Sequence, residues 1–283
     1  MKCSIIITTH ERPRALELVQ RALLRQSAGI EEVIFADDGS GSPTREVIAE
    51  FDRTTEFHVS HMWHPREGVQ KAAIVNSAIA VARGDVLVFL DGDCVPDRRW
   101  LSDHLREADG RTVWQGRRVQ LGSAVSDALS PDGVSHGELD GWLSPKCLGQ
   151  LIRRERRNFH LAIRIPRPIV RLFEKRKGLM GCNFSAPRAV VEAINGYDAS
   201  WEGAGQLCED LDLEIRLRQQ GTPLTPLLHA ANVFHLNHYR PTPAHVTQLR
   251  KERWLVKSPI AIDGIREAAE RIRQGTTRNL LVD

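Results

Sequence analysis

Five apolar residues, Val86 to Leu90, end abruptly in the tripeptide Asp91-Gly92-Asp93. Because the run is short and partly β-branched, it predicts a strand that is buried on both faces of a sheet. The two aspartates then follow the carboxyl end of that strand, where open α/β sheets bind their ligands. Carboxylate oxygens at such a position suit Mg²⁺ or Mn²⁺ carrying the phosphates of a nucleotide.

Taken alone, the tripeptide has simpler interpretations. Asp-Gly-Asp is common in plain turns between a strand and a loop. An EF-hand calcium loop is excluded, because its fifth position would be Val95 and its obligatory glycine would be Pro96. The choice between a turn and a metal site therefore depends on the rest of the chain.

Composition predicts a soluble globular protein: 41% of the 283 residues are hydrophobic and 27% are charged. No apolar run approaches the roughly 20 residues that cross a bilayer. The segment from Cys3 to Thr8 predicts a first strand rather than a signal peptide. Five scattered cysteines without a CxxC pair argue against disulfides and structural zinc, so we expect a cytoplasmic protein.

The first 90 residues alternate strand and helix patterns, which predicts a parallel sheet with right-handed crossovers. The expected strands are 4–8, 32–36, 57–59 and 86–90, and the expected helices are 14–26, 43–51 and an amphipathic 72–82. Beyond them we expect a helix at 98–108, a strand at 112–119, a long loop at 121–146, a proline-broken helix at 153–177, helices at 189–194 and 208–220, a final strand at 232–235 and a charged helix at 242–274.

Charge is concentrated in one segment. Residues 151–178 contain ten Lys or Arg and two Glu, a local charge of +8, although the whole chain carries only +3. Such an excess of positive charge favours an anionic partner, such as a phosphate group, an acidic glycan or a membrane surface. Within 153–177, apolar residues are interleaved with arginines, so the segment suits either peripheral contact with an anionic membrane or a lid over the site. A solvated basic helix face is the simpler alternative.

Polar motifs follow three of the expected strands and recur downstream. They are Thr8-Thr9-His10-Glu11-Arg12, Asp37-Asp38-Gly39-Ser40, Asp91-Gly92-Asp93, Gly181-Cys182-Asn183, Asn195-Gly196-Tyr197-Asp198, Glu209-Asp210-Leu211-Asp212-Leu213 and His235-Leu236-Asn237-His238. Their order over about residues 3–120 and 178–240 resembles the family 2 glycosyltransferases of the GT-A fold. More narrowly, it is similar to the branch whose C-terminal half resembles galactosyltransferase and N-acetylgalactosaminyltransferase domains.

This resemblance implies an α/β fold of the GT-A type, with a mostly parallel twisted sheet flanked by helices. It also implies one domain over residues 1–283. Within that domain we expect a nucleotide-sugar-binding half (1–120), a variable loop and basic segment (121–178), an acceptor and catalytic half (179–240) and a C-terminal helical extension (241–283).

The resemblance also assigns the nucleotide-sugar site. Thr8 and Asp38 would hold a uracil-like base, and position 10, His here instead of the usual Tyr, would pack against it. That substitution leaves the identity of the base open. The full expected set is Thr8, Thr9, His10, Arg12, Asp38, Lys71, Asp91, Gly92 and Asp93.

The cofactor implied is Mn²⁺ or Mg²⁺. Asp93 would bind it directly, Asp91 would bind the ribose or a metal-bound water, and His235 would be a third ligand, with His238 as a competing candidate. An imidazole beside carboxylates favours manganese.

On the acceptor side, the resemblance makes Asp210 the general base and Glu209 an acceptor ligand. An acidic helix start is the simpler reading of this pair. Trp201 and Asn183 complete the expected acceptor site, although Trp201 suits a core position equally well. The segment 201–208 departs from the family's compact Gly-Trp-Gly-Gly, which leaves the acceptor open.

Together these features predict a metal-dependent, inverting transferase that moves a sugar from a UDP-sugar to a hydroxyl of a glycan or lipid-linked acceptor. We expect no nucleic-acid partner and a cytoplasmic location, with peripheral contact at the inner face of the membrane as a further option. A sugar-phosphate nucleotidyltransferase would need a Gly-x-Gly-x-Arg loop after the first strand, and residues 8–12 contain none. A non-catalytic glycan-binding relative should lack Asp93, Asp210 or the histidine, and this sequence has all three.

Overall fold

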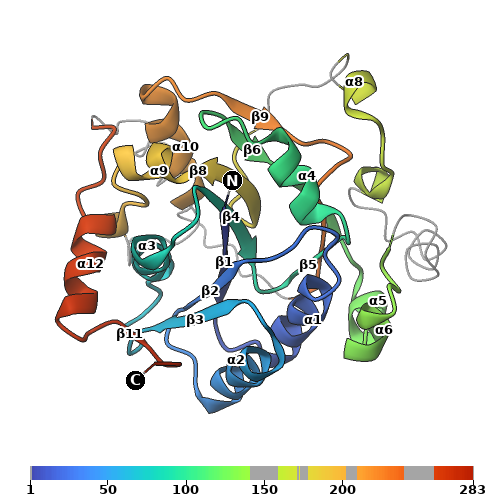
Figure 1. The fold of residues 1–283 in the computed structure, drawn as a ribbon, viewed down its shortest axis with the longest axis horizontal. Coiled ribbons are helices and arrows are strands. Elements are labelled where there is room, and N and C mark those ends of the chain that lie inside the picture. The colour runs from blue at the N-terminus through green and yellow to red at the C-terminus, as the bar shows by residue number, and fades with distance from the viewer. Residues whose placement is uncertain are drawn as a thin grey trace.

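The computed structural model describes residues 2–140, 159–170, 172, 178–201, 209–238 and 258–282, with the backbone alone at Phe159 and Trp201. An eight-stranded sheet in the order β11-β3-β2-β1-β4-β8-β6-β9 forms the centre of the molecule (Figure 1). A second sheet has three strands in the order β5-β10-β7.

The first half alternates strands and helices as its hydrophobic pattern predicts. The strands are β1 (Cys3–Thr9), β2 (Glu32–Asp37), β3 (His58–Trp63) and β4 (Val86–Asp91), and the helices between them are α1 (Pro13–Leu23), α2 (Ser42–Thr54) and α3 (Lys71–Val81). All four strands run parallel, with β1 paired to both β2 and β4. The polar motifs that follow β1, β2 and β4 therefore meet at one edge of the sheet.

The large sheet contains three short strands that the sequence pattern did not predict, and two of them, β8 and β11, make it mixed. β8 (Asn183–Pro187) lies antiparallel between β4 and β6 (Val113–Gln115). β9 (Leu224–Pro226) runs parallel to β6, and β11 (Arg278–Asn279) pairs antiparallel with β3, so the strand at 232–235 is not the last. None of the three shows the apolar alternation of a longer half-buried strand. The remaining pairs keep the sheet mostly parallel, as expected.

The predicted strand 112–119 is wrong as a single element, because the chain changes sheets at Gly116. β6 belongs to the large sheet, and β7 (Arg117–Gln120) belongs to the small one. A Cβ at Gly116 would collide with the Asn183 side chain, so glycine is needed where the chain turns. In the small sheet, β10 (Asn232–His235) pairs with β7 and with β5 (Cys94–Pro96), and His235 lies opposite Cys94.

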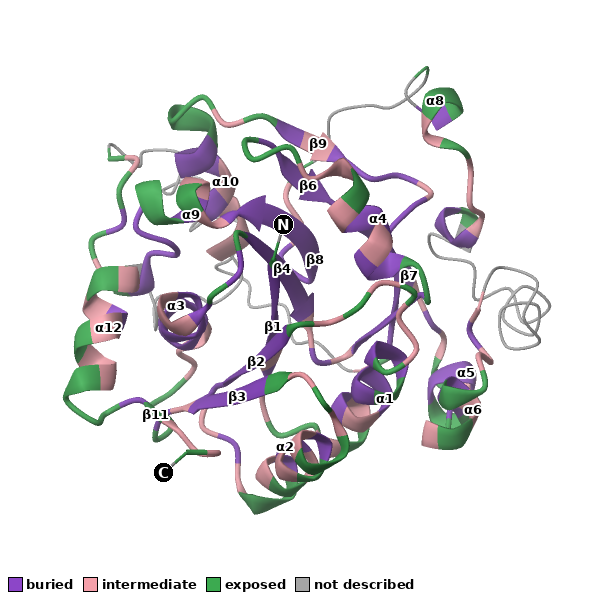
Figure 2. Cartoon of the chain, in the orientation of Figure 1, coloured by how far each residue is buried: buried purple, intermediate pink, exposed green. Residues whose placement is uncertain are grey.

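Helices cover both faces of the large sheet and bury two hydrophobic clusters (Figure 2). One cluster includes residues of α1, α2 and α4 (Trp100–Glu107). The other includes residues of α3, α9 (Arg188–Ala193) and α10 (Glu209–Gln219). Along β1, Ile5 and Ile7 join the first cluster and Ile6 joins the second, which is the two-residue period of a strand buried on both faces.

Helix α3 departs from the expected amphipathic pattern, because every residue from Ala72 to Ile79 is buried. Helix α12 (Ile265–Arg273) packs against α3 and covers the side that a surface helix would expose to water. The Asn76 side chain, which looks polar in the sequence, is satisfied inside the fold by backbone groups of Tyr197.

The other departures concern the variable regions. Part of the expected loop 121–146 forms two short helices, α5 (Ser123–Ala128) and α6 (Pro131–Ser135), and 141–146 lie outside the described residues. Within 153–177, the described part contains η1 (Phe159–Ala162) and α8 (Arg167–Val170). A further short turn is η2 (Ala199–Trp201), and of the expected helix 242–274 only α12 is seen, since 239–257 fall outside the described residues.

Across the described ranges, none of the helices combines the length and the apolar character that crossing a membrane requires.

Candidate active site

A pocket of about 220 Å³ opens at the carboxyl ends of β1, β2 and β4. All nine residues expected in the nucleotide-sugar site line it: Thr8, Thr9, His10, Arg12, Asp38, Lys71, Asp91, Gly92 and Asp93. Apolar side chains of Ala36, Val69 and Ile74 complete the lining. The parallel strand order brings these distant segments to one place.

Asp91 is held by hydrogen bonds from two other pocket residues. The β1–β4 register places Thr8 opposite Asp91, and Thr8 Oγ1 donates to Asp91 Oδ1 over 2.7 Å. The Lys71 ammonium donates to the same oxygen over 3.1 Å. Lys71 Nζ also lies 3.6 Å from Glu209 Oε1, so it links the aspartate of the pocket to the carboxylate predicted for the acceptor side.

Lys71 carries a stable positive charge. Burial alone favours the neutral amine, but the carboxylates of Asp91, Glu209 and Asp210 outweigh it and hold the pKa of Lys71 well above its usual value. A fixed ammonium in this pocket is suited to an anionic diphosphate.

Asp38 is oriented in part by Gln70 and His64, which no sequence motif indicated. The backbone N–H of Gln70 lies 3.2 Å from both carboxylate oxygens, and His64 Nε2 lies 3.2 Å from Oδ1. His10 Nδ1 donates to the Asp38 carbonyl oxygen over 2.9 Å, and the Arg66 guanidinium contacts the His10 ring. His10 is thus held at the wall of the pocket.

One carboxylate and two imidazoles converge at Asp93. His238 Nε2 lies 2.9 Å from Asp93 Oδ2, and His235 Nε2 lies 3.5 Å from Oδ1. One ligand atom from each residue lies within 4.8 Å of the others, and this oxygen and nitrogen set suits Mn²⁺. Both candidate histidines therefore fit the expected metal. Asp91 is not part of this cluster among the described residues.

Gly92 permits the sharp turn between the two aspartates. Its N–H donates to the Thr8 carbonyl oxygen over 2.7 Å, and a Cβ there would lie 2.8 Å from the same oxygen. A side chain at this position would therefore push the turn away from β1. Arg12 contributes from the neighbouring loop, with Nη2 3.0 Å from His238 Nδ1.

The environment of Asp210 leaves one carboxylate oxygen able to accept a proton. Its Oδ2 accepts the Gly181 N–H over 2.9 Å, whereas its buried Oδ1 has no hydrogen-bond partner among the described residues. Burial raises the pKa of Asp210, although Lys71 and the Gly181 hydrogen bond oppose the shift. A Cβ at Gly181 would collide with this carboxylate, so glycine is required for the contact.

Glu209 precedes Asp210 at the start of α10 and titrates with it. The pKa of Glu209 is raised to about 7. Burial is the main cause, the neighbouring Asp210 adds to the shift, and Lys71 opposes it. The pair therefore loses negative charge as the pH falls through neutrality, and with it the ion pair to Lys71.

We expect Glu209→Gln to shift the acid limb of kcat/KM to lower pH. In the wild type, the raised pKa means that activity requiring the ionised pair falls below about pH 7. The substitution removes a negative charge beside Asp210, which makes the remaining carboxylate easier to ionise. Rate profiles between about pH 5 and 9 measure the shift. Glu192→Gln, a half-exposed acid on α9, serves as the control and should leave the limb in place. An unchanged limb in Glu209→Gln would contradict the assignment.

The structure corrects the expectation for Asn183, which is fully buried. Its Oδ1 accepts hydrogen bonds from Trp100 Nε1 and His104 Nε2, and its Nδ2 donates to the carbonyls of Arg117 and Ala231. An amide with all its hydrogen-bonding capacity used inside the core is not available to an acceptor. The side chain of Trp201 lies outside the described residues.

The described part of the basic segment turns its arginines inward. Arg164 pairs with Asp97 at 3.2 Å and with Asp103 at 2.5 Å, and Arg167 donates to the Pro226 carbonyl oxygen over 3.2 Å. These two charges are used within the protein, so they lend no support to the expected membrane contact. Ile169 and Leu172 are exposed, at 50% and 85%.

Sequence comparison relates this chain to glycosyltransferases. Residues 4–163, more than half of the chain, match the family model described as Glycosyl transferase family 2. The validoxylamine A glucosyltransferase of Streptomyces hygroscopicus subsp. jinggangensis is 25% identical over 232 residues, which are 78% of this chain and 52% of that protein. The chondroitin synthase of Pasteurella multocida is 29% identical over 105 residues, 37% of this chain and 11% of that protein. The chain spans about half the length of its curated relatives, or less.

Solved structures share the fold at low sequence identity. A mannosyltransferase from Pyrobaculum calidifontis, PcManGT, solved with GDP-Man and Mn²⁺, has a TM-score of 0.56 and 13% identity and covers 88% of this chain and 60% of that chain. TarS 1–349 of S. aureus, solved with UDP, has a TM-score of 0.55 and 14% identity and covers 95% of this chain and 68% of that chain. These neighbours confirm the expected GT-A fold, and the family match over residues 4–163 shows that the chain belongs to glycosyl transferase family 2.

Proposed function

We propose that this chain transfers a sugar from a UDP-sugar to a hydroxyl group by a single, inverting displacement. The observation that carries the proposal is the convergence of two distinct groups around Lys71. On one side lies the pocket with Asp38, Asp91 and Asp93, and on the other lies Asp210 with a buried oxygen that has no partner among the described residues.

In this proposal the pocket binds the nucleotide. The Asp38 carboxylate accepts an N–H of the base, and His10 packs against the ring. The ammonium of Lys71 neutralises charge on the diphosphate, and Thr8 keeps Asp91 in position to accept a ribose hydroxyl. A divalent cation held by Asp93, His235 and His238 would supply further positive charge against the departing diphosphate.

Asp210 acts as the general base. Its Oδ1, which has no hydrogen-bond partner in the described part of the chain, accepts the proton of the attacking hydroxyl while Gly181 holds Oδ2. Attack from the side opposite the diphosphate inverts the anomeric carbon, so an α-linked sugar becomes β-linked. Glu209, fixed by Lys71, binds a hydroxyl of the acceptor.

The acceptor that we propose is a glycan or a lipid-linked saccharide. Peripheral contact with an anionic membrane would bring the second class within reach. Exposed Ile169 and Leu172 suit such a contact better than Arg164 and Arg167, which are engaged internally.

A panel of sugar nucleotides tests the proposal. With Mn²⁺ present, we expect release of nucleoside diphosphate from at least one UDP-sugar, at least about tenfold faster than from the GDP- or ADP-sugar counterpart, because Asp38 and His10 read the base. Release from a GDP-sugar alone would contradict the assignment of uracil as the base but would still support a glycosyltransferase. No release from any sugar nucleotide, with or without an acceptor extract, would contradict the function.

A further inference from the structure

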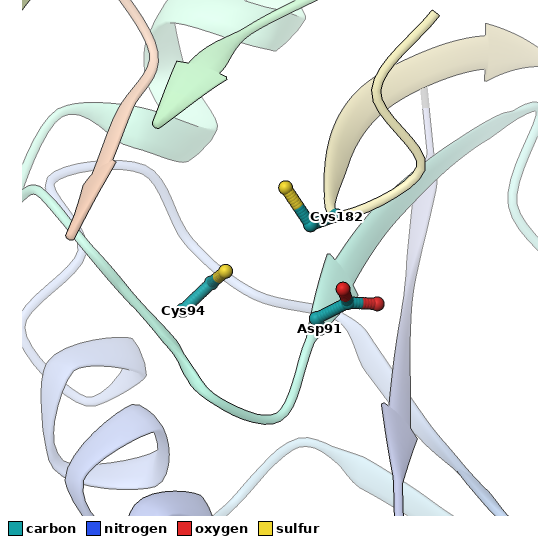
Figure 3. A group of neighbouring side chains, drawn as sticks. All are labelled: Asp91, Cys94 and Cys182. Atoms are coloured by element: carbon teal, nitrogen blue, oxygen red, sulfur yellow. The ribbon is translucent and has the colours of Figure 1, made fainter. Parts of the chain in front are cut away.

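Two cysteines far apart in the sequence meet directly behind the Asp91-Gly92-Asp93 turn. Cys94 lies in β5, and Cys182 immediately precedes β8. Figure 3 shows the two cysteine side chains near each other and beside Asp91, whose carboxylate is turned away from the sulfurs. One ligand atom from each of Asp91, Cys94 and Cys182 lies within 4.8 Å of the other two. The mechanism proposed above uses neither thiol.

We propose that Cys94, Cys182 and Asp91 form a second cation site, which takes a thiophilic divalent metal such as Zn²⁺. Thiolate sulfur is a soft ligand that selects Zn²⁺ over Mg²⁺ or Mn²⁺. The two clusters adjoin, because Cys94 Sγ lies 3.6 Å from Asp93 Oδ1. Asp91 would then bind a thiophilic metal, and Asp93, at the other end of the turn, would bind Mn²⁺ or Mg²⁺.

The distances suit a metal without refolding. Zinc binds sulfur at about 2.3 Å and carboxylate oxygen at about 2.0–2.2 Å, so tetrahedral ligand atoms lie roughly 3.5–3.8 Å apart. The three atoms here are at most 4.8 Å apart, so closing around a metal needs a shift of about 1 Å. Three protein ligands leave a fourth position open.

The backbone fixes the three ligands before a metal arrives. Cys94 is held opposite His235 in the small sheet, and the Asp91 N–H donates to the Cys182 carbonyl oxygen over 3.4 Å. Asp91 Oδ1 accepts from Thr8 and Lys71, but its Oδ2 accepts no hydrogen bond from the described residues. That oxygen is therefore available without breaking the contacts of Oδ1.

Charge balance favours the exchange. When Zn²⁺ displaces the two thiol protons, the buried site gains two positive charges and loses two, so no net charge is buried. The Arg118 guanidinium lies beside the site, with Nη1 3.8 Å from Cys182 Sγ. Entry is from the pocket, because Asp91 lines it and its side chain is 20% exposed, whereas Cys94 and Cys182 are sealed from solvent.

Cobalt spectroscopy of the full chain tests the site. In reduced protein stripped of metal, Co²⁺ should produce a near-ultraviolet sulfur-to-cobalt charge-transfer band, and equimolar Zn²⁺ should abolish it. Cys94→Ala and Cys182→Ala should each lose the band. Cys3→Ala removes another buried cysteine, at the start of β1, and should keep it, as should His235→Ala.

A second variant keeps the test informative if the cysteine variants unfold. Asp91→Asn should retain the band but weaken Co²⁺ binding at least about tenfold, since a neutral amide replaces a charged ligand. Absence of the band in the wild type would overturn the proposal, and so would a band that survives both cysteine variants. Isolation of a Cys94–Cys182 disulfide from protein that shows no Co²⁺ band after reduction would also overturn it.

Metal bound here should weaken binding of the sugar donor, because Asp91 would then coordinate the metal instead of the ribose. This consequence rests on the proposed function, whereas the Co²⁺ spectrum needs no sugar nucleotide. A band without any transferase activity would therefore support the metal site and count only against the proposed function.

Discussion

Asp93→Ala should lower Mn²⁺-dependent turnover of the sugar nucleotide by roughly 10²-fold or more. A bound divalent cation stabilises developing charge on a phosphoryl leaving group by several kcal/mol, and each 1.36 kcal/mol is worth about tenfold in rate. Asp93 is the carboxylate that both His235 and His238 approach, so its loss leaves two imidazoles without the charged ligand. Release of nucleoside diphosphate measures turnover, and electron paramagnetic resonance of Mn²⁺ measures metal binding independently.

The matched control is Asp85→Ala. Asp85 is an exposed carboxylate just before β4, and its loss should leave both turnover and Mn²⁺ binding unchanged. His235→Ala and His238→Ala should each raise the Mn²⁺ concentration needed for half-maximal rate. Full activity of the wild type in a chelator would remove the metal from the mechanism altogether.

The sequence was sufficient to predict which residues line the pocket, because the order of parallel strands along the chain determines where their ends lie. Strongly apolar runs located β1, β2 and β4, and a polar residue that follows a parallel strand has only one edge of the sheet to occupy. Thr8 and Asp91, distant in the chain, are opposite one another for this reason. The resemblance to a family added the roles, and the geometry brought all nine residues to one pocket.

Asn183 shows where that logic fails. It follows Gly181-Cys182 in a polar motif, so it was assigned to the acceptor, but β8 is antiparallel and its side chain points into the core between Trp100 and His104. A five-residue strand ending in proline carries too little pattern to reveal its direction or its buried face. Its partners on α4 and β7 are known only once the fold is formed.

The cysteines show a second limit. Without a CxxC pair, their spacing argued against structural zinc, yet β5 and the start of β8 bring Cys94 and Cys182 together beside Asp91. Spacing rules detect groups of ligands within one local segment, whereas this group combines residues of β4 and β5 with the residue that precedes β8. The same limit left His235 and His238 as competitors, although the structure places both at Asp93.

Asp210→Asn should reduce turnover about 10²-fold or more while the affinity for UDP stays unchanged. The amide keeps the size of the side chain and can still accept the Gly181 N–H, but it cannot take a proton from the attacking hydroxyl. Asp210 does not line the nucleotide pocket, so titration calorimetry with UDP should match the wild type. Loss of UDP binding in parallel with turnover would point to a structural role instead.

The stability of two variants, Asp210→Asn and Asp212→Asn, distinguishes a catalytic base from a structural buried acid in the same helix. Burial raises the pKa of Asp210, so the ionised carboxylate costs the folded state free energy above the unfolded pKa, and Asp210→Asn should not lower the melting temperature at neutral pH. Asp212 provides the contrast, because its Oδ2 accepts from Arg216 Nε at 2.9 Å and Nη2 at 2.7 Å inside the core. Asp212→Asn leaves that guanidinium without its counter-charge and should cost about 1–3 kcal/mol of stability. Near-wild-type turnover in Asp210→Asn would make it an ordinary acid at the start of α10, and the base would have to be sought elsewhere.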